Sequence, residues 1–274
     1  MTVLETESLT RCYGALKAVD SLNISVEAGE VFGLLGPNGA GKTTVIKMLC
    51  TLLPPTSGTA RVAGFDIRKQ AVEVRHSIGY VPQMLSADGT LTGYENLLVF
   101  AKLYEVPRAE RASRLQEALA FMGLVEASGK MVREYSGGMI RRLEIAQCML
   151  HRPRMLFLDE PTVGLDPLAR KSVWERIEQL RTEYGTTILL TTHLMEEADN
   201  LCHRVAIMDH GKVVVIGTPE ELKASIEGGS DAGGETEEAT LDEVFIHYTG
   251  GLLDERGGGY RETARRRRTA HRLR

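Results

Sequence analysis

Residues 36–44 have the composition and spacing of a loop that holds a phosphate chain. They read Gly-Pro-Asn-Gly-Ala-Gly-Lys-Thr-Thr, which matches G-x-x-x-x-G-K-[ST], and they follow an apolar run and precede a helical pattern. Glycines let the backbone curl so that N–H groups point at phosphate oxygens, and the start of a helix adds a positive end. Lys42 would face the β- and γ-phosphates, and the Thr43 hydroxyl would bind Mg²⁺. We call this segment the phosphate cradle and predict as its residues Gly36, Pro37, Asn38, Gly39, Ala40, Gly41, Lys42, Thr43 and Thr44.

Asp159 and Glu160 follow the apolar run of residues 155–158 and could carry hydrolytic chemistry. A carboxylate at the end of a strand beside a phosphate cradle is placed to hold Mg²⁺, and we assign that role to Asp159. Glu160 points elsewhere and could polarise a water molecule in line with the γ-phosphate as a general base. Taken alone, an acidic pair where a strand meets a loop is common, so the assignment depends on the cradle.

Ser136, Gly137 and Gly138 precede another helical pattern, expected from residue 140 to residue 150. Serine is a natural N-cap, and two glycines leave the first N–H groups of the helix uncovered. The segment could therefore seek a second phosphate. An ordinary capped helix explains the same residues, and the local sequence does not decide between the two interpretations.

The composition narrows the class of protein and its compartment. A net charge of −4 over 274 residues excludes a generally basic nucleic-acid binder, and a single tryptophan argues against base stacking on a ring-lined platform. The cysteines are far apart and contain no C-x-x-C, which suits a reducing compartment. The first residues do not resemble a secretion signal, and no apolar run approaches the length of a membrane-spanning helix. We therefore expect a cytoplasmic protein.

Short apolar runs without polar alternation predict an α/β fold with a buried parallel sheet. The runs are residues 31–35, 155–158, 187–190 and 205–208. Residues 213–216 follow His210 and Gly211 and predict a hairpin at the end of the sheet.

Strand patterns stop between about residues 84 and 150, where three helical patterns predict an all-helical insertion. The first opens with Thr92 and Glu95, the spacing of a capping box. The second runs from Pro107, suited to a first helical position, to Gly123, suited to a stop. The third begins around Ser136.

The composition changes after Pro219. Residues 228–234 are typical of a flexible linker, and residues 240–243 predict a capped helix with Gly250 beyond it. This helix would place Leu241, Val244, Phe245 and Tyr248 on one face, to pack either on its own chain or on a second copy. We divide the chain into a domain of residues 1–220, an extension of residues 221–252 and a tail of residues 253–274. Seven of the last fourteen residues are arginines, and we expect the tail to be disordered, with attraction to anionic lipid as the alternative.

The order of these features resembles that of ATP-binding-cassette ATPases over roughly residues 2–220. Such a resemblance implies a P-loop NTPase core of the RecA-like type with an antiparallel β subdomain, the helical insertion and a short C-terminal extension. It also implies ATP and Mg²⁺ as the bound groups. The features that carry it are, in order, the phosphate cradle, Gln83, residues 136–138, Asp159 with Glu160, the sequence Gly-Leu-Asp-Pro at residues 164–167, and His193.

The resemblance implies further roles for single residues. Tyr13 would stack on adenine, and Gln83 would link Mg²⁺ and the attacking water to the helical insertion. Residues 136–138, which we call the signature turn, would contact the γ-phosphate of a nucleotide held by another copy. Asp166 would cross the dimer interface, and His193 would touch the γ-phosphate. A packed edge tyrosine, a solvated turn glutamine and a capping histidine remain alternatives for Tyr13, Gln83 and His193.

Two residues depart from the usual signature, which opens with Leu and closes with Gln. Tyr135 and Met139 occupy those positions, and neither side chain has to present backbone N–H groups. The residues around them, with Leu-Asp-Glu-Val-Phe at residues 241–245, resemble the daunorubicin-resistance branch of bacterial drug-export ATPases. This branch implies a head-to-tail dimer at the cytoplasmic face of the cell membrane, docked through the helical insertion on a separate transmembrane permease. The alternative is a soluble cassette ATPase acting on DNA or the ribosome.

Overall fold

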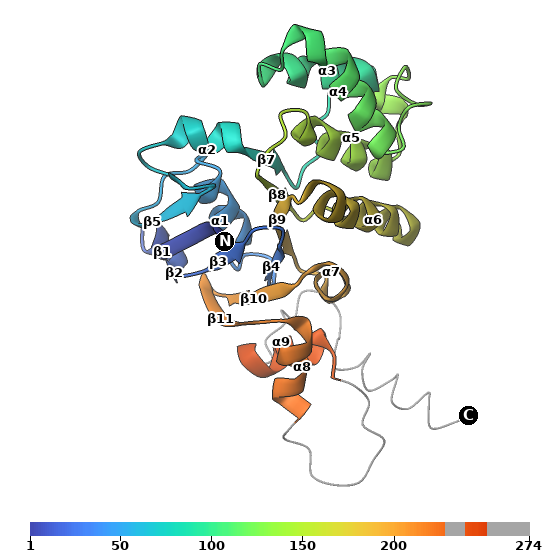
Figure 1. Cartoon of the computed structure of the whole chain (residues 1–274). Coiled ribbons are helices and arrows are strands. Elements are labelled where there is room, and N and C mark those ends of the chain that lie inside the picture. Colours follow the sequence, from blue (N-terminus) through green and yellow to red (C-terminus); the bar gives the residue numbers. More distant parts are fainter. Residues whose placement is uncertain (228–238, 251–274) are drawn as a thin grey trace, which may run out of the picture.

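The strands without polar alternation form one six-stranded sheet (Figure 1). The computed structural model describes residues 1–227 and 239–250. Across the sheet the order is β11-β10-β4-β9-β8-β7, parallel except for the antiparallel edge strand β11. This arrangement confirms the predicted α/β class and the terminal hairpin. The strands are β4 (Val31–Leu35), β7 (Ile78–Val81), β8 (Met155–Asp159), β9 (Thr187–Thr192), β10 (Arg204–Asp209) and β11 (Lys212–Gly217).

An antiparallel sheet packs on one side of the parallel sheet, with helix α1 (Lys42–Leu49) between the two. The buried side chains Val45 and Ile46 of α1 join Leu4 and Leu9 of the antiparallel sheet and Phe32 of β4 in one hydrophobic cluster. Burying α1 on both sides fixes its N-terminus, which is the end that meets the phosphate cradle. The antiparallel part consists of β1 (Thr2–Tyr13), β2 (Leu16–Leu22), β3 (Ser25–Glu27), β5 (Ser57–Val62) and β6 (Phe65–Asp66), followed by α2 (Ala71–Ser77).

The three expected helices of the insertion form a lobe of their own, at the top of Figure 1. Thr92 and Glu95 make both bonds of the predicted capping box. Pro107 is the N-cap of the second helix, one position earlier than expected. The third helix begins at Gly137, three residues before the expected residue 140, because Ser136 caps it and both glycines of the signature turn form its first turn. The elements are α3 (Gly93–Leu103), α4 (Arg108–Phe121), the short 3₁₀ helix η1 (Val132–Glu134) and α5 (Gly137–Met149).

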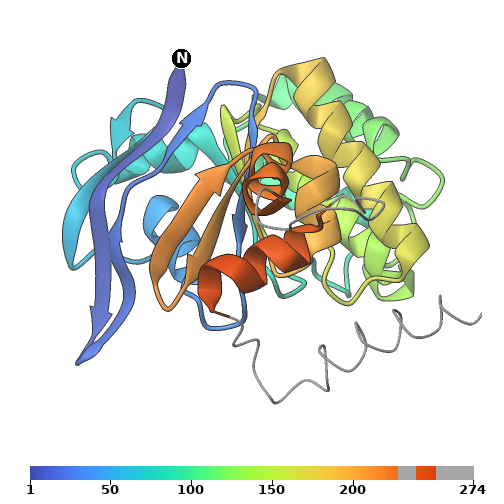
Figure 2. The same cartoon turned by 90° about the horizontal axis from the view of Figure 1, so that it is seen from below.

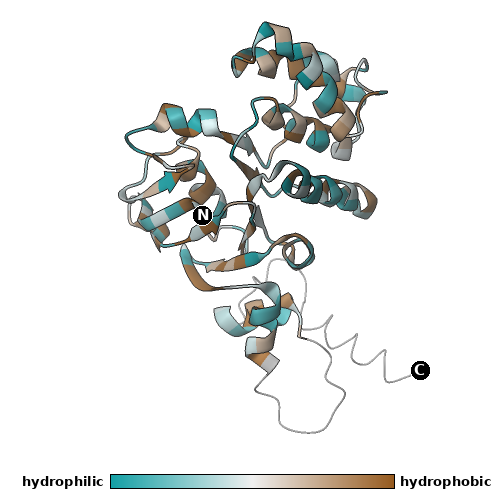
Figure 3. Ribbon diagram, viewed as in Figure 1, coloured by the Kyte–Doolittle hydropathy of each residue, from teal (hydrophilic) through white to brown (hydrophobic). Residues whose placement is uncertain are grey.

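Two helices connect the last strands of the parallel sheet. Helix α6 (Pro167–Tyr184) packs against α5, and α7 (Met195–Leu201) follows β9 and packs against β4 and α6. The buried side chains Val173, Ile177 and Leu180 of α6 face the core, while much of its outer surface is hydrophilic in Figure 3. These helices therefore carry the loops after β8 and β9 on a fixed base.

The C-terminal helix packs on its own chain. Helices α8 (Pro219–Glu227) and α9 (Leu241–Thr249) lie together against α7 and the edge strand β11, as Figure 2 shows from below. The capping box at Thr240 and the C-cap at Gly250 are as predicted. Leu241, Val244 and Phe245 are buried in the main core and Tyr248 packs against it. The domain limits at residues 220 and 252 stay predictions, and the linker of residues 228–234 and the arginine-rich tail lie outside the described residues.

Candidate functional site

The phosphate cradle connects β4 to α1 and needs its glycines for steric reasons. A Cβ atom on Gly36 would lie 2.3 Å from the carbonyl oxygen of Met208, and one on Gly41 would lie 2.3 Å from that of Ala18. Gly41 also has φ of 104°, a conformation that glycine adopts without strain. As the N-cap of α1 it offers no side chain to the first N–H groups of the helix, which have no acceptor inside a helix. Those groups could donate to an anion, which the motif predicts.

The side chain of Lys42, itself a residue of the cradle, is buried. Its Nζ atom donates to the carbonyl oxygens of Gly36, at 2.8 Å, and Pro37, at 3.1 Å, and lies 3.3 Å from Oε1 of Glu160. Burial lowers the pKa of the Lys42 ammonium, and the Glu160 carboxylate opposes that shift. These contacts hold the lysine in a fixed position within the loop.

Glu160 is the point at which three loops meet. Gln83 donates from Nε2 to Oε2 of Glu160 at 2.8 Å, and Nδ1 of His193 lies 3.2 Å from Oε1. The three residues follow β7, β8 and β9, and the carboxyl ends of parallel strands share one edge of the sheet. Glu160 itself has φ of 48°, an unusual value for a non-glycine residue and one that clusters at active sites. This brings together the three residues predicted to be catalytic.

Thr43 and Asp159 form a pair of oxygen ligands beside the cradle. The Thr43 hydroxyl donates to Oδ1 of Asp159 at 3.0 Å, and the Thr191 hydroxyl donates to the same oxygen at 2.6 Å. A hydroxyl and a carboxylate are the hard oxygen donors that Mg²⁺ prefers, and this ion commonly keeps water and substrate phosphates as its other ligands. Within residues 1–227 and 239–250 no group of three or more His, Cys, Asp or Glu could hold a metal by itself. The pair fits a cation shared with a phosphate chain.

Thr191 is a site residue that the sequence did not single out. Its hydroxyl accepts from the backbone N–H of Glu160 at 3.0 Å while it donates to Asp159. It thereby fixes both acidic residues. The signal was present in the sequence, since two threonines end the apolar run of β9, but threonine is so common in strands that it attracted no functional interpretation.

The signature turn lies in the other lobe, at the N-terminus of α5. Ser136 caps this helix, with its Oγ accepting from the backbone N–H of Met139 at 3.3 Å. A Cβ atom on Gly138 would lie 2.8 Å from the Cβ of Ala169, so glycine lets α5 approach α6 closely. The capped-helix interpretation is confirmed, and contact with a phosphate remains a prediction.

Asp166 and Tyr13 are both exposed. Asp166 is exposed and caps α6, with Oδ1 accepting from the N–H groups of Leu168 and Ala169. Tyr13 ends β1, is 47% exposed, and has the Arg11 guanidinium 4.7 Å from the centre of its ring. The hairpin that carries Tyr13 reaches the cradle through Ala18, whose carbonyl touches Gly41. The roles of both residues toward a nucleotide stay predictions.

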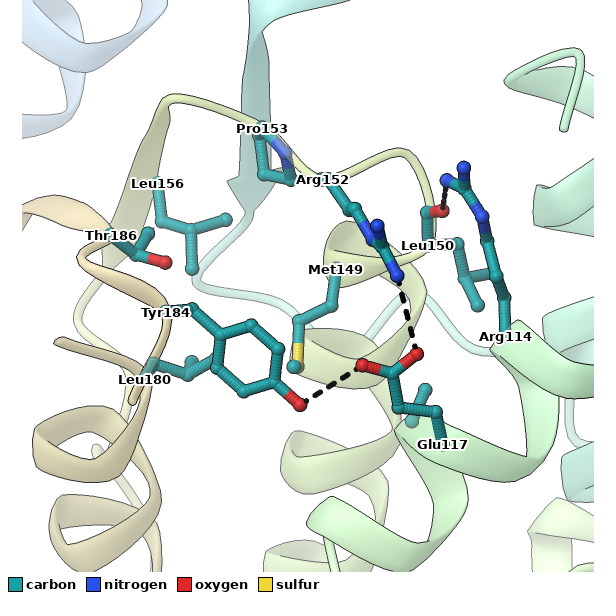
Figure 4. Close-up of a pocket in the computed structure, with 11 residues that line it drawn as sticks. Arg114, Glu117, Met149, Leu150, Arg152, Pro153, Leu156, Leu180, Tyr184 and Thr186 are labelled. Carbon is teal, nitrogen blue, oxygen red and sulfur yellow. Dashed lines mark hydrogen bonds and ion pairs between the residues drawn. The ribbon is translucent and has the colours of Figure 1, made fainter. Parts of the chain in front are cut away.

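The structure has another concave feature, a cavity of about 160 Å³ between α4, α5 and α6 (Figure 4). It opens near the amino ends of β8 and β9, whereas the cradle lies at their carboxyl ends. Its polar groups bond to one another: Glu117 accepts from the Tyr184 hydroxyl and pairs with Arg152, and Arg114 donates to the Leu150 carbonyl. This cavity contains none of the predicted site residues.

Comparison with known proteins decides the family. A family model described as ABC transporter matches residues 19–163, and a shorter AAA-domain model matches residues 132–199. The chain belongs to the ABC transporter family. The predicted resemblance, the P-loop fold and the enzyme class, an ATPase, are thereby confirmed, and the cassette binds nucleotide. Among the described residues, none of the helices combines the length and the apolar content that crossing a membrane requires.

Named relatives agree along most of the cassette. The daunorubicin/doxorubicin resistance ATP-binding protein of Streptomyces peucetius is 47% identical over 81% of this chain and 67% of its own length. The linearmycin resistance ATP-binding protein of Bacillus subtilis is 40% identical over 82% of this chain and 72% of its own. A solved ATP-binding subunit of an ABC transporter superposes with a TM-score of 0.77 at 30% identity, over 90% of this chain and 100% of that one.

Proposed function

We propose that the cassette hydrolyses ATP to drive export of a drug or another hydrophobic compound through a separate transmembrane subunit. The observation that carries this proposal is the convergence of Lys42, Gln83 and His193 on the Glu160 carboxylate, beside the Thr43–Asp159 pair. A triphosphate seated on the α1 N-terminus would meet a charge, a base and a cation site together.

The chemical step assigns each residue a task. Oxygen of a water molecule bonds to the γ-phosphorus, the bond from phosphorus to the β–γ bridging oxygen breaks, and the water proton passes to the Glu160 carboxylate. Gln83 and His193 orient the water and the γ-phosphate, and Lys42 balances the charge of the β- and γ-phosphates. Thr43 and Asp159, together with Gln83 as the resemblance implies, would hold Mg²⁺, which would neutralise the phosphate chain when bound.

A second copy of the chain would complete the site. Within one chain the signature turn and the phosphate cradle belong to different lobes (Figure 1), so a nucleotide that meets the first N–H groups of α5 would be held by another chain. Two copies placed head to tail would form an isologous C2 dimer with two nucleotides between them. The exposed side chain of Leu168, two residues after Asp166, supports an interface at the start of α6. ATP would favour this closed dimer, and hydrolysis would release it.

The helical lobe offers a surface for a membrane subunit. Exposed apolar side chains follow Gln83 directly and continue on α3, where Figure 3 also shows hydrophobic residues. Docking there would place the cassette at the cytoplasmic face of the membrane, with no role for nucleic acid. The side chains are Met84, Leu85, Tyr94, Val99 and Leu103.

Export of a drug is supported by the relatives, whose names refer to resistance against daunorubicin, doxorubicin and linearmycin. The test is co-expression of the full chain with the membrane protein encoded beside it, followed by measurement of daunorubicin and linearmycin retained in cells. We expect less retention with the natural chain than with a Glu160→Gln variant. Equal retention of both compounds, with the chain recovered on ribosomes or DNA instead of membranes, would refute the exporter assignment.

A further inference from the structure

Arg141 and Glu144 form an ion pair inside the helical lobe. Both lie on α5, one turn apart, and each side chain is only 2% exposed. Nη1 of Arg141 lies 3.0 Å from Oε2 of Glu144. Charged side chains are rarely buried to this degree, because leaving water costs several kcal/mol for each ion. Such a pair persists where further hydrogen bonds compensate that cost, and among the described residues they leave Nε of Arg141 as the one polar side-chain atom of the pair without a partner.

Those further bonds all go to one loop. Arg141 donates from Nη1 to the carbonyl oxygen of Pro82 at 2.7 Å and from Nη2 to that of Gln83 at 2.8 Å. Glu144 accepts through Oε1 from the backbone N–H of Ser86 and from its hydroxyl, the latter at 3.0 Å. One turn of α5 therefore grips residues 82–86 at both ends. Between the two ends the side chains of this loop are exposed, so the loop has little packing of its own to hold it.

The same loop delivers the Gln83 side chain to Glu160. The side-chain amide of Gln83 donates to Glu160, while the backbone carbonyl oxygen of Gln83 accepts from Arg141. Arg141 is five residues beyond Ser136, on the same helix as the signature turn. A guanidinium that grips two successive carbonyls also fixes the orientation of the peptide between them, which a flexible ammonium does not.

We propose that Arg141 and Glu144 are positioning residues that couple the signature helix α5 to Gln83, an inference that rests on the function proposed above. Rotation or displacement of α5 moves the backbone of Gln83 with it and sets whether the Gln83 amide reaches Glu160. Contact of the signature turn with a nucleotide is thereby transmitted to the hydrolytic carboxylate within the same chain.

This coupling predicts a specific kinetic defect. The cradle does not depend on the pair, so the affinity for ATP stays the same when the pair is lost. Turnover falls, because a displacement of about 1 Å in a catalytic group lowers kcat by roughly a hundredfold. A role in folding alone would lower the Tm without separating kcat from KM.

The experiment replaces the pair in the full chain by apolar residues of similar size, Arg141→Met with Glu144→Leu, an exchange that buried ion pairs commonly tolerate. The readouts are kcat, KM, the Kd for ATP and the Tm. The matched control removes the ion pair of Arg204 and Glu30. Its two bonds, of 2.6 and 2.9 Å, lie at the amino ends of β10 and β4, opposite the cradle. We expect the double variant to lose about ten- to a hundredfold in kcat with Kd unchanged, and the control to lose Tm alone.

Gln83→Ala distinguishes coupling from a general defect. If the pair acts through Gln83, then combining Arg141→Met and Glu144→Leu with Gln83→Ala causes no further loss of kcat beyond that of Gln83→Ala. The coupling would be overturned if the kcat losses of Gln83→Ala and of the Arg141–Glu144 variant multiply when combined. It would also be overturned if the Arg141–Glu144 variant keeps the same kcat as the Arg204–Glu30 control. Should the apolar pair fail to fold, Arg141→Lys keeps the charge without the planar fork and must show the same fall in kcat. A natural chain that hydrolyses no ATP would instead refute the proposed function.

Discussion

The Nζ atom of Lys42 lies 3.3 Å from Oε1 of Glu160, and both side chains are buried. The ammonium group that we propose to bind the phosphates is thus paired with the carboxylate that we propose as the general base. A bound triphosphate would compete with Glu160 for Lys42, which would free that carboxylate to accept a proton. We therefore expect nucleotide binding and activation of the base to be linked through this ion pair.

Replacing Glu160 by Gln should block hydrolysis and spare ATP binding. The amide cannot accept a proton, and general bases commonly contribute about 10²- to 10⁴-fold in rate. We expect kcat to fall within that range and a dimer to accumulate with ATP, as measured by phosphate release and by light scattering. Glu178→Gln on α6 is the control, since that side chain pairs with Arg181 far from the cradle. Hydrolysis at the natural rate in Glu160→Gln would show that another group is the base.

Replacing Thr43 by Val should weaken the response to Mg²⁺. The change removes the hydroxyl that bonds to Asp159 and leaves Asp159 bonded to Thr191. Loss of one ligand should raise the Mg²⁺ concentration for half-maximal hydrolysis by about tenfold or more. Thr43→Ser keeps a hydroxyl, so its half-maximal Mg²⁺ concentration should equal that of the natural chain. Titration of Mg²⁺ at fixed ATP measures both. An unchanged midpoint in the Val variant would exclude Thr43 as a ligand.

Much of the site could be predicted because its residues follow local rules. The cradle is a fixed pattern within nine residues, and the carboxylates end a strand whose apolar run is unmistakable. Strand β7 was missed for a physical reason, since it is short and contains Gly79, which weakens a strand pattern. A Cβ atom on Gly79 would lie 2.5 Å from the side chain of Leu156 and 2.8 Å from that of Cys148, so tertiary packing requires the residue that hides the strand.

The remaining contacts depend on chain segments that meet only in the fold. Arg141 and Glu144 stand in a helical pattern where charged residues indicate a solvated face, yet both are buried. Their partners at residues 82–86 are more than fifty positions away. Spacing within one element does not predict this kind of burial, because a buried ion pair is stabilised by bonds from another element.

Glu197 on α7 should make stability depend on pH. Its carboxyl is fully buried, with Oε1 accepting from the Thr162 hydroxyl at 2.7 Å and from Nε1 of Trp174 at 3.0 Å. Burial raises the pKa of Glu197 above the ordinary value of 4.5, although hydrogen bonds from Thr162, Thr192 and Trp174 and the charge of Arg170 oppose the shift. The folded state therefore holds its proton to higher pH than the unfolded state, and the natural chain loses stability as the pH rises above about 4.5.

Glu197→Gln removes that titration. The free energy of unfolding of this variant, relative to the natural chain, should increase as the pH rises above about 4.5, by about 1.4 kcal/mol for each unit by which the pKa is raised. Urea unfolding followed by the fluorescence of Trp174, the single tryptophan of the chain, measures it. A difference that stays constant from about pH 5 to about pH 8 would mean that Glu197 does not titrate on folding.

Tyr135, at the first position of the signature segment, should matter for packing and not for catalysis. Its side chain is buried, and its hydroxyl donates to the carbonyl oxygen of Ala127 at 2.7 Å. A Cβ atom on Gly93, in the first turn of α3, would lie 2.2 Å from that hydroxyl. Gly93→Ala should therefore destabilise the chain by about 1–3 kcal/mol through overpacking.

Adding Tyr135→Leu should recover most of that loss, because the shorter side chain removes the clash. The two changes form a cycle in which the double variant is more stable than the sum of the single losses predicts. Denaturant unfolding of the four chains measures the coupling, and kcat of Tyr135→Leu should stay within about twofold of the natural value, since the N–H groups at the α5 terminus belong to the backbone. If the losses of stability in the two single variants simply add, Tyr135 and Gly93 do not interact. A large fall in kcat for Tyr135→Leu would assign the tyrosine a part in hydrolysis.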